Sequence, residues 1–255
     1  MNIYQAVLLG IVEGLTEFLP VSSTGHLILT AHILGVDNSG FTKSFEIAIQ
    51  MGAIMSVILL YAKRLSTDYE MWKRILVAFL PTGILGFLLY KLIKTYLIGN
   101  DKVVVLSLIV GGVFLLFADR VCERFCYIGD IRAMSLKRAF LIGLFQSLAM
   151  IPGVSRSAST IIGGMLVGLH RKASAEFSFL LAVPTMIIAT SYDVYKSHST
   201  FTQSEWHLLL IGFLSAFFTA LLTVKVFLKF ISKHSFFPFG IYRIALGFSY
   251  ALFFL

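Results

Sequence analysis

Two carboxylates four residues apart open the first polar stretch of the chain, Glu13 to His26, which reads EGLTEFLPVSSTGH. On a helix, Glu13 and Glu17 project from the same face. Apolar segments flank the stretch on both sides, and charged groups in such surroundings need strong compensation. Mg²⁺ can supply it, because this ion is commonly held by one or two carboxylates together with phosphate oxygens. We therefore predict a metal-linked function; a carboxylate pair neutralised by Arg or Lys is the alternative.

Three hydroxyls and a histidine follow the carboxylates in this first stretch. Pro20 breaks the helix, and Ser22, Ser23 and Thr24 come directly after the break. His26 lies within about one helical turn of them. A hydroxyl beside a histidine base is the recurring arrangement of an activated nucleophile. The same residue types also cap helices, so the spacing leaves both interpretations open.

A second polar stretch, Pro152 to Thr160 (PGVSRSAST), lies in equally apolar surroundings. The planar guanidinium of Arg156 suits bidentate recognition of phosphate. Ser157, Ser159 and Thr160 can cap the half-helix that follows, whose first N–H groups form an anion site. An Arg–Glu pair that ties the two stretches together is the alternative, and it is compatible with phosphate binding. We expect the two stretches to meet and form one phosphate-handling site.

Composition indicates a membrane protein. The chain has 255 residues, of which 58% are hydrophobic and 13% are charged, whereas soluble domains carry about 25% charged residues. The net charge is +8, but the basic residues lie at the ends of apolar runs, which favours a topology signal over nucleic-acid binding. No linker or low-complexity segment divides the chain, which predicts a single integral membrane domain.

Apolar runs predict the elements that position the two polar stretches. Each polar stretch separates two half-length apolar segments, which is typical of a re-entrant hairpin lining a cavity. Six further runs approach the length of about 20 residues that a membrane span needs. These runs are Phe45–Tyr61, Ile75–Leu92, Val103–Ala118, Phe177–Tyr195, Leu208–Leu228 and Phe239–Leu255.

A hairpin followed by three spans therefore occurs twice, in residues 1–118 and 139–255, with a polar loop at 119–138. Phe45 follows Pro20 at the same interval as Phe177 follows Pro152. Three spans is an odd number, so the second copy enters the membrane from the opposite side. We predict an all-α fold of six transmembrane helices and two re-entrant hairpins, arranged as an inverted-topology repeat with the site at its interface.

Lys and Arg residues predict the orientation of the chain in the membrane. Most of them fall on the side opposite the mouth of the first hairpin, including those of the loop at 119–138. Cytoplasmic segments carry the excess of Lys and Arg, so this side is predicted to be cytoplasmic. Both termini and the mouth of the first hairpin are then expected to face outward.

The two polar stretches resemble the two motifs of the undecaprenyl-pyrophosphate phosphatase (bacitracin-resistance) family of bacterial inner membranes. The resemblance extends through KSFEIAIQMG and AEFSFLLAVP and covers nearly the whole chain. Ala158 departs from the glycine usual in the second motif. The resemblance implies hydrolysis of undecaprenyl pyrophosphate to undecaprenyl phosphate and inorganic phosphate. Such an enzyme recycles the lipid carrier for cell-wall synthesis and confers bacitracin resistance. The predicted outward opening of the site indicates that it acts at the outer (periplasmic) face.

The resemblance also implies roles for the polar residues. Glu13 and Glu17 would hold Mg²⁺ or Ca²⁺, and Ser23 and His26 would be the hydroxyl and base of the first motif. His26 is then expected to activate Ser23 or a water. The predicted catalytic set is Ser23, His26, Glu17 and Arg156. The predicted substrate-binding set is Ser22, Thr24, Ser155, Arg156, Ser157 and Thr160.

An inverted-repeat transporter or lipid flippase is the competing function, because broken helices are common in transporters. The hydroxyl–histidine–arginine set favours the enzyme, since a simple carrier does not need it. The expected partners are undecaprenyl pyrophosphate, with its tail in an apolar groove, and membrane lipid. No nucleic acid is expected. The sequence sets no oligomeric state, so a homodimer stays open.

Overall fold

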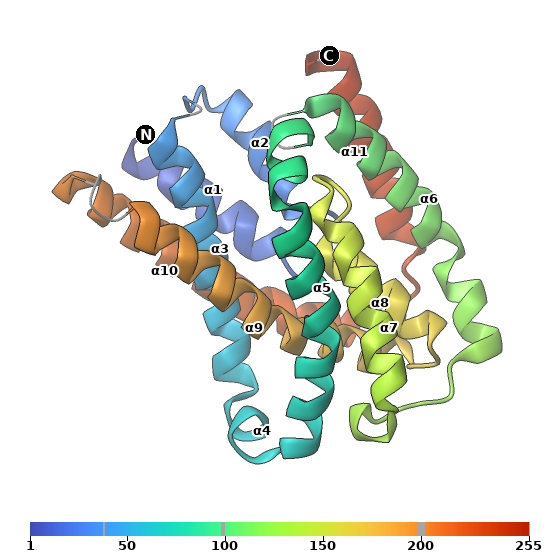
Figure 1. The fold of residues 1–255 in the computed structure, drawn as a ribbon. Coiled ribbons are helices and arrows are strands. Elements are labelled where there is room, and N and C mark those ends of the chain that lie inside the picture. The colour runs from blue at the N-terminus through green and yellow to red at the C-terminus, as the bar shows by residue number, and fades with distance from the viewer. Residues whose placement is uncertain (38, 98–99, 198–201, 255) are drawn as a thin grey trace.

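The computed structural model describes residues 1–255 apart from 38, 98–99, 198–201 and 255; the side chains of 90–91, 93–96, 121–123, 192–197, 204 and 254 also lie outside the description. Within these limits the chain is helical, with one isolated bridge between Ile128 and Leu169, so the predicted all-α class is confirmed (Figure 1). The elements are α1 (Ile3–Thr16), α2 (Ser23–Ile33), α3 (Gly40–Leu60), α4 (Ala62–Thr67), α5 (Tyr69–Tyr96), α6 (Asp101–Phe125), η1 (Ile131–Ala133), α7 (Leu136–Ser147), η2 (Leu148–Met150), α8 (Arg156–Leu166), α9 (Arg171–Ser197), α10 (Gln203–Ile231) and α11 (Phe237–Phe254).

Polar side chains cap the N-termini of several apolar helices. Asn2 and Gln5 form a capping box at the start of α1, in which each side chain accepts from the backbone N–H of the other. Thr202 and Glu205 form the same arrangement at α10, and the side chain of Ser39 caps α3. The first N–H groups of a helix lack partners within it, so these caps fix where each helix begins.

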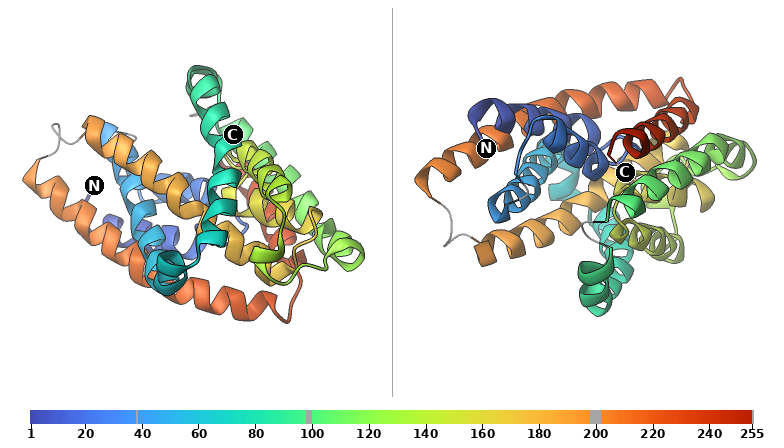
Figure 2. Two further views of the ribbon diagram at one scale, coloured as in Figure 1. Left: turned by 60° about the horizontal axis from the view of Figure 1, so that its bottom comes forward. Right: turned by 90° about the horizontal axis from the view of Figure 1, so that it is seen from above.

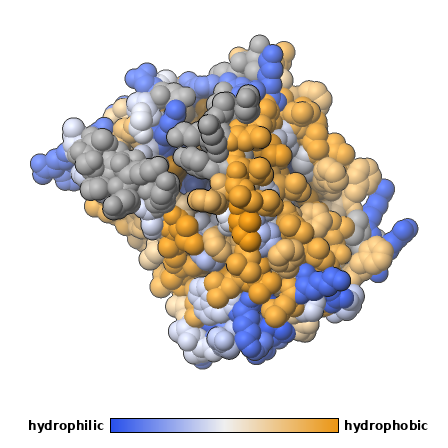
Figure 3. Space-filling model, viewed as in Figure 1, coloured by the Kyte–Doolittle hydropathy of each residue, from blue (hydrophilic) through white to orange (hydrophobic). Residues whose placement is uncertain are grey.

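Among the described residues, five helices are long and apolar enough to cross a membrane, namely α3, α5, α6, α9 and α10. Apolar surface spans the middle of the face in Figure 3, with hydrophilic residues gathered at its lower end. On α10 the large exposed side chains recur at four-residue intervals from Leu210 to Val226, which forms a continuous apolar stripe. The chain is thus a polytopic membrane protein. The sixth predicted span corresponds to α11, which belongs with the shorter apolar helices.

The predicted loop at 119–138 is wrong in extent, because α6 runs on to Phe125. The polar residue expected to end the span, Asp119, is buried and has partners from later in the chain. Its carboxylate accepts from Arg171 Nε at 2.6 Å and from the backbone N–H of Phe236 at 2.7 Å. These tertiary bonds stabilise a charge inside a helix, which local sequence does not reveal.

The two halves of the chain interlock. Helix α1 packs along α10 in the second half, and α7 packs along α5 in the first half (Figures 1 and 2). Helix α6 pairs with α11, and α3 lies against α9. In the predicted repeat α1 corresponds to α7 and α10 to α5, so each short helix packs on the equivalent long helix of the other half. Neither half can therefore bury its apolar surface alone.

The two polar turns align in the structure with a shift of one residue from the alignment of Pro20 with Pro152. Helices α2 and α8 have 11 residues each, and their N-caps are Ser22 and Ser155. The second turn accommodates the additional residue at Gly153, which has φ +88°. A left-handed conformation of this kind favours glycine. Ser22 and Ser155 therefore occupy equivalent positions in the two polar turns.

Candidate functional site

Two serines in left-handed backbone conformations shape the polar turns. Ser22 has φ 71° and Ser155 has φ 75°, a region that residues with a side chain rarely occupy. The Ser22 hydroxyl accepts from Gly25 N at 3.4 Å, and the Ser155 hydroxyl accepts from Ala158 N at 3.2 Å. Both serines thus cap the helix that follows. Such conformations persist only where the surroundings enforce them, and they cluster at functional sites.

The carboxylate of Glu17 joins the two turns. Its Oε2 accepts from Ser23 Oγ at 2.7 Å, and its Oε1 accepts from Arg156 Nη2 at 2.8 Å. The side chains of Glu17 and Arg156 are 6% and 12% exposed. The predicted meeting of the two polar stretches is confirmed by these contacts, which place a hydroxyl, a carboxylate and a guanidinium in one chain of hydrogen bonds.

Helix α9 supplies the remaining partners of Arg156. Arg156 Nη1 donates to the carbonyl of Ser178 at 2.9 Å and lies 3.3 Å from its hydroxyl. Thr160 donates to the same hydroxyl at 2.6 Å. The guanidinium lies 5.8 Å from the Phe18 ring centroid. Its Nε is buried and has no hydrogen-bond partner in the described part of the chain. Arg156 therefore keeps one buried donor unused.

A cavity of about 230 Å³ opens between the turns. Six of the predicted residues line it, namely Glu17, Ser22, Ser23, Thr24, Ser155 and Arg156. Four polar side chains outside the predicted catalytic and substrate-binding sets also line it, namely Gln50, Thr82, Gln146 and Thr185. The cavity is thus rich in hydrogen-bonding groups and carries one guanidinium, as recognition of a phosphate requires.

His26 is directed away from Ser23 and is absent from the described residues that line the cavity. Its Nδ1 lies 2.7 Å from the carbonyl oxygen of Ser22, and its Nε2 lies 2.7 Å from the hydroxyl of Tyr242. A carbonyl can only accept, so Nδ1 carries the proton. The rings of His26 and Tyr242 stack, with centroids 5.5 Å apart. The expected contact between His26 and Ser23 is not formed, because a distant tyrosine occupies the other ring nitrogen.

Two further predicted residues brace the second turn and do not line the cavity. Ser157 donates to the carbonyl of Leu19 at 2.6 Å, which ties the second turn to the first. Thr160 Oγ1 lies 2.8 Å from the carbonyl of Arg156, in addition to its bond to Ser178. Ser178 was missed from the sequence because a serine between two phenylalanines of an apolar helix gives no local signal.

Glu13 is fully buried, and neither of its carboxylate oxygens has a hydrogen-bond partner in the described part of the chain. A buried carboxylate needs a proton or a cation as compensation. Glu13 and Glu17 supply the oxygen donors that hard divalent cations prefer, so the donor set fits Mg²⁺ or Ca²⁺. Groups of three or more His, Cys, Asp or Glu placed to hold a metal do not occur among the described residues. A cation at Glu13 and Glu17 would therefore complete its shell with substrate or water oxygens.

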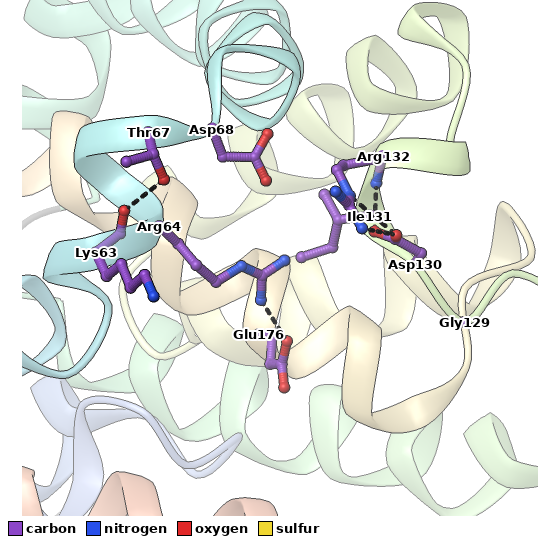
Figure 4. Close-up of a pocket in the computed structure, with 9 residues that line it drawn as sticks. All are labelled: Lys63, Arg64, Thr67, Asp68, Gly129, Asp130, Ile131, Arg132 and Glu176. Carbon is purple, nitrogen blue, oxygen red and sulfur yellow. Dashed lines mark hydrogen bonds and ion pairs between the residues drawn. The ribbon is translucent and has the colours of Figure 1, made fainter.

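A second, larger cavity of about 640 Å³ lies beside α4 (Figure 4). Three basic and three acidic side chains line it, namely Lys63, Arg64, Arg132, Asp68, Asp130 and Glu176. Figure 4 shows the guanidinium of Arg64 directed at Glu176. The distance from Arg64 Nη1 to Glu176 Oε2 is 3.1 Å. Hydrogen bonds from Arg132 hold the pKa of Asp130 below its usual range. The charges balance, and none of the predicted site residues lies here.

The fold and the buried hydroxyl–carboxylate–guanidinium site define a polytopic membrane protein equipped for phosphate chemistry. A sequence model of the family "Bacitracin resistance protein BacA" matches residues 6–249, and the chain belongs to this family.

Curated relatives carry the name undecaprenyl-diphosphatase. The protein of Aquifex aeolicus (strain VF5) is 64% identical over 255 residues, which cover 100% of both chains. The protein of Sulfurihydrogenibium sp. (strain YO3AOP1) is 55% identical over 253 residues, 99% of each chain. The protein of Thermus thermophilus is 55% identical over 258 residues, covering 100% of this chain and 98% of the relative.

Proposed function

We propose that this chain is an undecaprenyl-diphosphatase, which hydrolyses undecaprenyl pyrophosphate to undecaprenyl phosphate and inorganic phosphate. Membership of the bacitracin-resistance family and full-length similarity to enzymes of that name support this function. The hydrolysis recycles the lipid carrier for cell-wall synthesis and confers bacitracin resistance. The observation that carries the chemistry is the chain of hydrogen bonds from Ser23 through Glu17 to Arg156.

Arg156 binds the terminal phosphate. Its guanidinium borders the cavity, and its fork geometry suits two phosphate oxygens at once. In the absence of substrate the guanidinium is paired with Glu17. An arriving pyrophosphate competes for this fork and so frees one oxygen of Glu17. The hydroxyls and backbone N–H groups at the starts of α2 and α8 contribute further donors to the phosphate oxygens.

Ser23 is the nucleophile in this mechanism, and Glu17 accepts its proton. The bond from Ser23 Oγ to the terminal phosphorus forms as the bond from that phosphorus to the bridging oxygen breaks, which releases undecaprenyl phosphate. A water then attacks the phosphoserine and yields inorganic phosphate and the free hydroxyl. The 2.7 Å contact supports Glu17 as the proton acceptor in place of His26. His26 positions the backbone of the first turn through Ser22.

Glu13 and Glu17 would hold the divalent cation of this site, and the partnerless oxygens of Glu13 support that assignment. When bound, such an ion neutralises negative charge that develops on the pyrophosphate oxygens. The residues of the chain perform the remaining tasks of binding, orientation and proton transfer. Mg²⁺ and Ca²⁺ are both suited to these oxygen donors.

The two polar hairpins enter the membrane from opposite sides, α11 is the sixth span, and the site opens to the outer face. The matched short helices α2 and α8 and the interlocked halves support the repeat. The excess of Lys and Arg on the opposite side supports the orientation. A cysteine placed at the exposed Asp37 should react with an impermeant reagent in intact cells. Reaction only after permeabilisation would reverse this orientation.

The proposed function is tested with purified protein in detergent, where no gradient exists for a transporter to use. Wild type should release inorganic phosphate from undecaprenyl pyrophosphate with Mg²⁺ or Ca²⁺ present. Ser23→Ala should lower turnover by about 10³-fold or more, since it removes the attacking group. Ser66→Ala, at an exposed serine of α4, is the control. Acid quenching of wild type should trap a phosphoserine; robust turnover by Ser23→Ala would instead assign the attack to water.

A further inference from the structure

Arg243 of α11 is fully buried, and all five of its N–H donors reach backbone carbonyls. Its Nε lies 3.4 Å from the carbonyl of Leu108, and Nη1 and Nη2 make two contacts each, at 2.9–3.3 Å. Carboxylates are absent from this set of acceptors. Such a side chain is costly to bury, so its position calls for a physical explanation.

The acceptors belong to three segments that the guanidinium joins. Pro20 lies in the first turn, Gly153 and Val154 lie in the second turn, and Ser107 and Leu108 lie in α6. The first turn continues directly to Ser23, and the second continues directly to Arg156. Carbonyls at breaks in membrane helices lack helical partners and must find donors in the protein. Arg243 supplies those donors to both breaks at once.

We propose that Arg243 is a positioning residue of the phosphatase site. It sets the spacing of the two polar turns and thereby holds Ser23 and Glu17 against Arg156. The fork is rigid and its five bonds point in fixed directions, so the turns cannot shift relative to each other without breaking several of them. This inference deepens the proposed function and rests on it.

The packing around Arg243 shows how closely the guanidinium is held. A Cβ added at Gly111 would lie 2.8 Å from Arg243 Cζ and closer still to Nη2, the nitrogen that bonds Gly153 and Ser107. Gly111 of α6 therefore leaves room for the side chain. Gly240 offers a matched position in the same helix pair. A Cβ there would meet Leu116 Cδ2 at 2.7 Å and the carbonyl of Gly112 at 2.8 Å, and none of its three nearest atoms belongs to the guanidinium.

The test compares Gly111→Ala, Gly240→Ala and Arg243→Lys, with kcat measured per folded protein from the monodisperse fraction. Displacement of reacting groups by about 1 Å can cost about 10²-fold in rate. Gly111→Ala and Arg243→Lys should each lower kcat by about 10-fold or more, with a smaller change in KM. Gly240→Ala crowds the same two helices, but no guanidinium atom is among the three nearest neighbours of its added Cβ, so its kcat should stay within about twofold of wild type.

A double variant tests whether Gly111→Ala lowers kcat by displacing the guanidinium of Arg243. Lysine has no guanidinium, so Gly111→Ala should cost no further activity in the Arg243→Lys background. The proposal is overturned if Gly111→Ala has the kcat of Gly240→Ala, or if its loss is undiminished beside Arg243→Lys. Reduced thermal stability with unchanged kcat in Arg243→Lys would also overturn it. If Ser23→Ala loses activity while the Arg243 and Gly111 variants keep full activity, the proposed phosphatase site is retained and only the positioning role of Arg243 is rejected.

Discussion

Two arginine–glutamate pairs of this molecule have similar geometry and different surroundings. Arg156 and Glu17 are 2.8 Å apart, with side chains 12% and 6% exposed, and they lie where the two polar turns meet. Arg64 and Glu176 are 3.1 Å apart, with side chains 37% and 19% exposed, and they border the open cavity beside α4. The buried pair shares its carboxylate with Ser23, whereas the open pair lies among balanced charges.

The difference shows that an ion pair acquires a function from its surroundings. An exposed pair contributes about 0–1 kcal/mol because water screens it. Breaking a buried pair by removing one partner costs about 3–5 kcal/mol, because a charge is left uncompensated. The cavity borders the contact between Glu17 and Arg156, and in the proposed mechanism an arriving phosphate replaces Glu17 as the partner of Arg156.

Glu17→Gln should lower turnover by about 10³-fold, because it removes the proposed acceptor of the Ser23 proton. Glu176→Gln, at the open pair, should leave turnover within about twofold and change stability by at most about 1 kcal/mol. Phosphate release and thermal unfolding of both variants are the measurements. Equal losses of turnover in the two variants would contradict the contrast.

Removal of divalent cations should lower wild-type turnover by about 10²-fold, since a bound metal contributes several kcal/mol of charge stabilisation. Addition of Mg²⁺ or Ca²⁺ should restore it. Glu13→Gln should raise the Mg²⁺ concentration needed for half-maximal turnover, while Glu176→Gln should not. Titration of Mg²⁺ with chelator-treated protein makes the comparison. Full turnover in excess chelator would rule out the metal at Glu13 and Glu17.

Tyr242→Phe should lower kcat by about 10-fold at most, because it removes one hydrogen bond to His26, worth about 0.5–1.5 kcal/mol. The effect should be far below that of Glu17→Gln, since neither ring nitrogen of His26 contacts Ser23 or Glu17 in the described structure. Steady-state kinetics with undecaprenyl pyrophosphate separate the two. A loss as large as that of Ser23→Ala would restore His26 to the role of base.

Asp130→Asn should have the smallest effect, a loss of at most about 1 kcal/mol of stability, since the pair with Arg132 is largely exposed. Arg132 lowers the pKa of Asp130, so the stabilisation is present above the ordinary aspartate pKa and is lost as the pH falls through the lowered value. Thermal unfolding at neutral and at acidic pH should show the difference between variant and wild type at neutral pH only. A difference that persists in acid would contradict this linkage.

Much of the site was predictable because local chemistry specifies it. Pro20 and the Pro152-Gly153 pair break helices, which fixes the two turns. Burying Arg156 or the carboxylates of Glu13 and Glu17 in apolar surroundings costs free energy unless the charges are paired, which predicted a contact between them. The contact between Glu17 and Arg156 is the result.

Partners that come from distant helices were not predictable. The bond from Tyr242 decides which way His26 faces, and it spans 216 residues of sequence. The acceptors of Arg243 are backbone carbonyls, which every residue carries and no pattern marks. The contact of the Ser178 hydroxyl with Arg156 was not predictable for the same reason, because only tertiary packing brings the two groups together. The extent of α6 was missed for a similar reason, since Asp119 finds its partners in α9 and before α11.

The interlocking of the halves determines when contacts between them can form during biosynthesis. Helix α1 is made first, yet its main partner α10 is among the last helices to leave the ribosome. Contacts between segments so far apart in sequence form slowly, because a long loop must close before they stabilise anything. Until α10 is made, Gly14 lacks the close packing against Ala216 that it has in the complete fold. The nascent first half is therefore expected to remain an incomplete intermediate, in which Ser23 and Glu17 exist long before Arg156, their partner from the second half, is made.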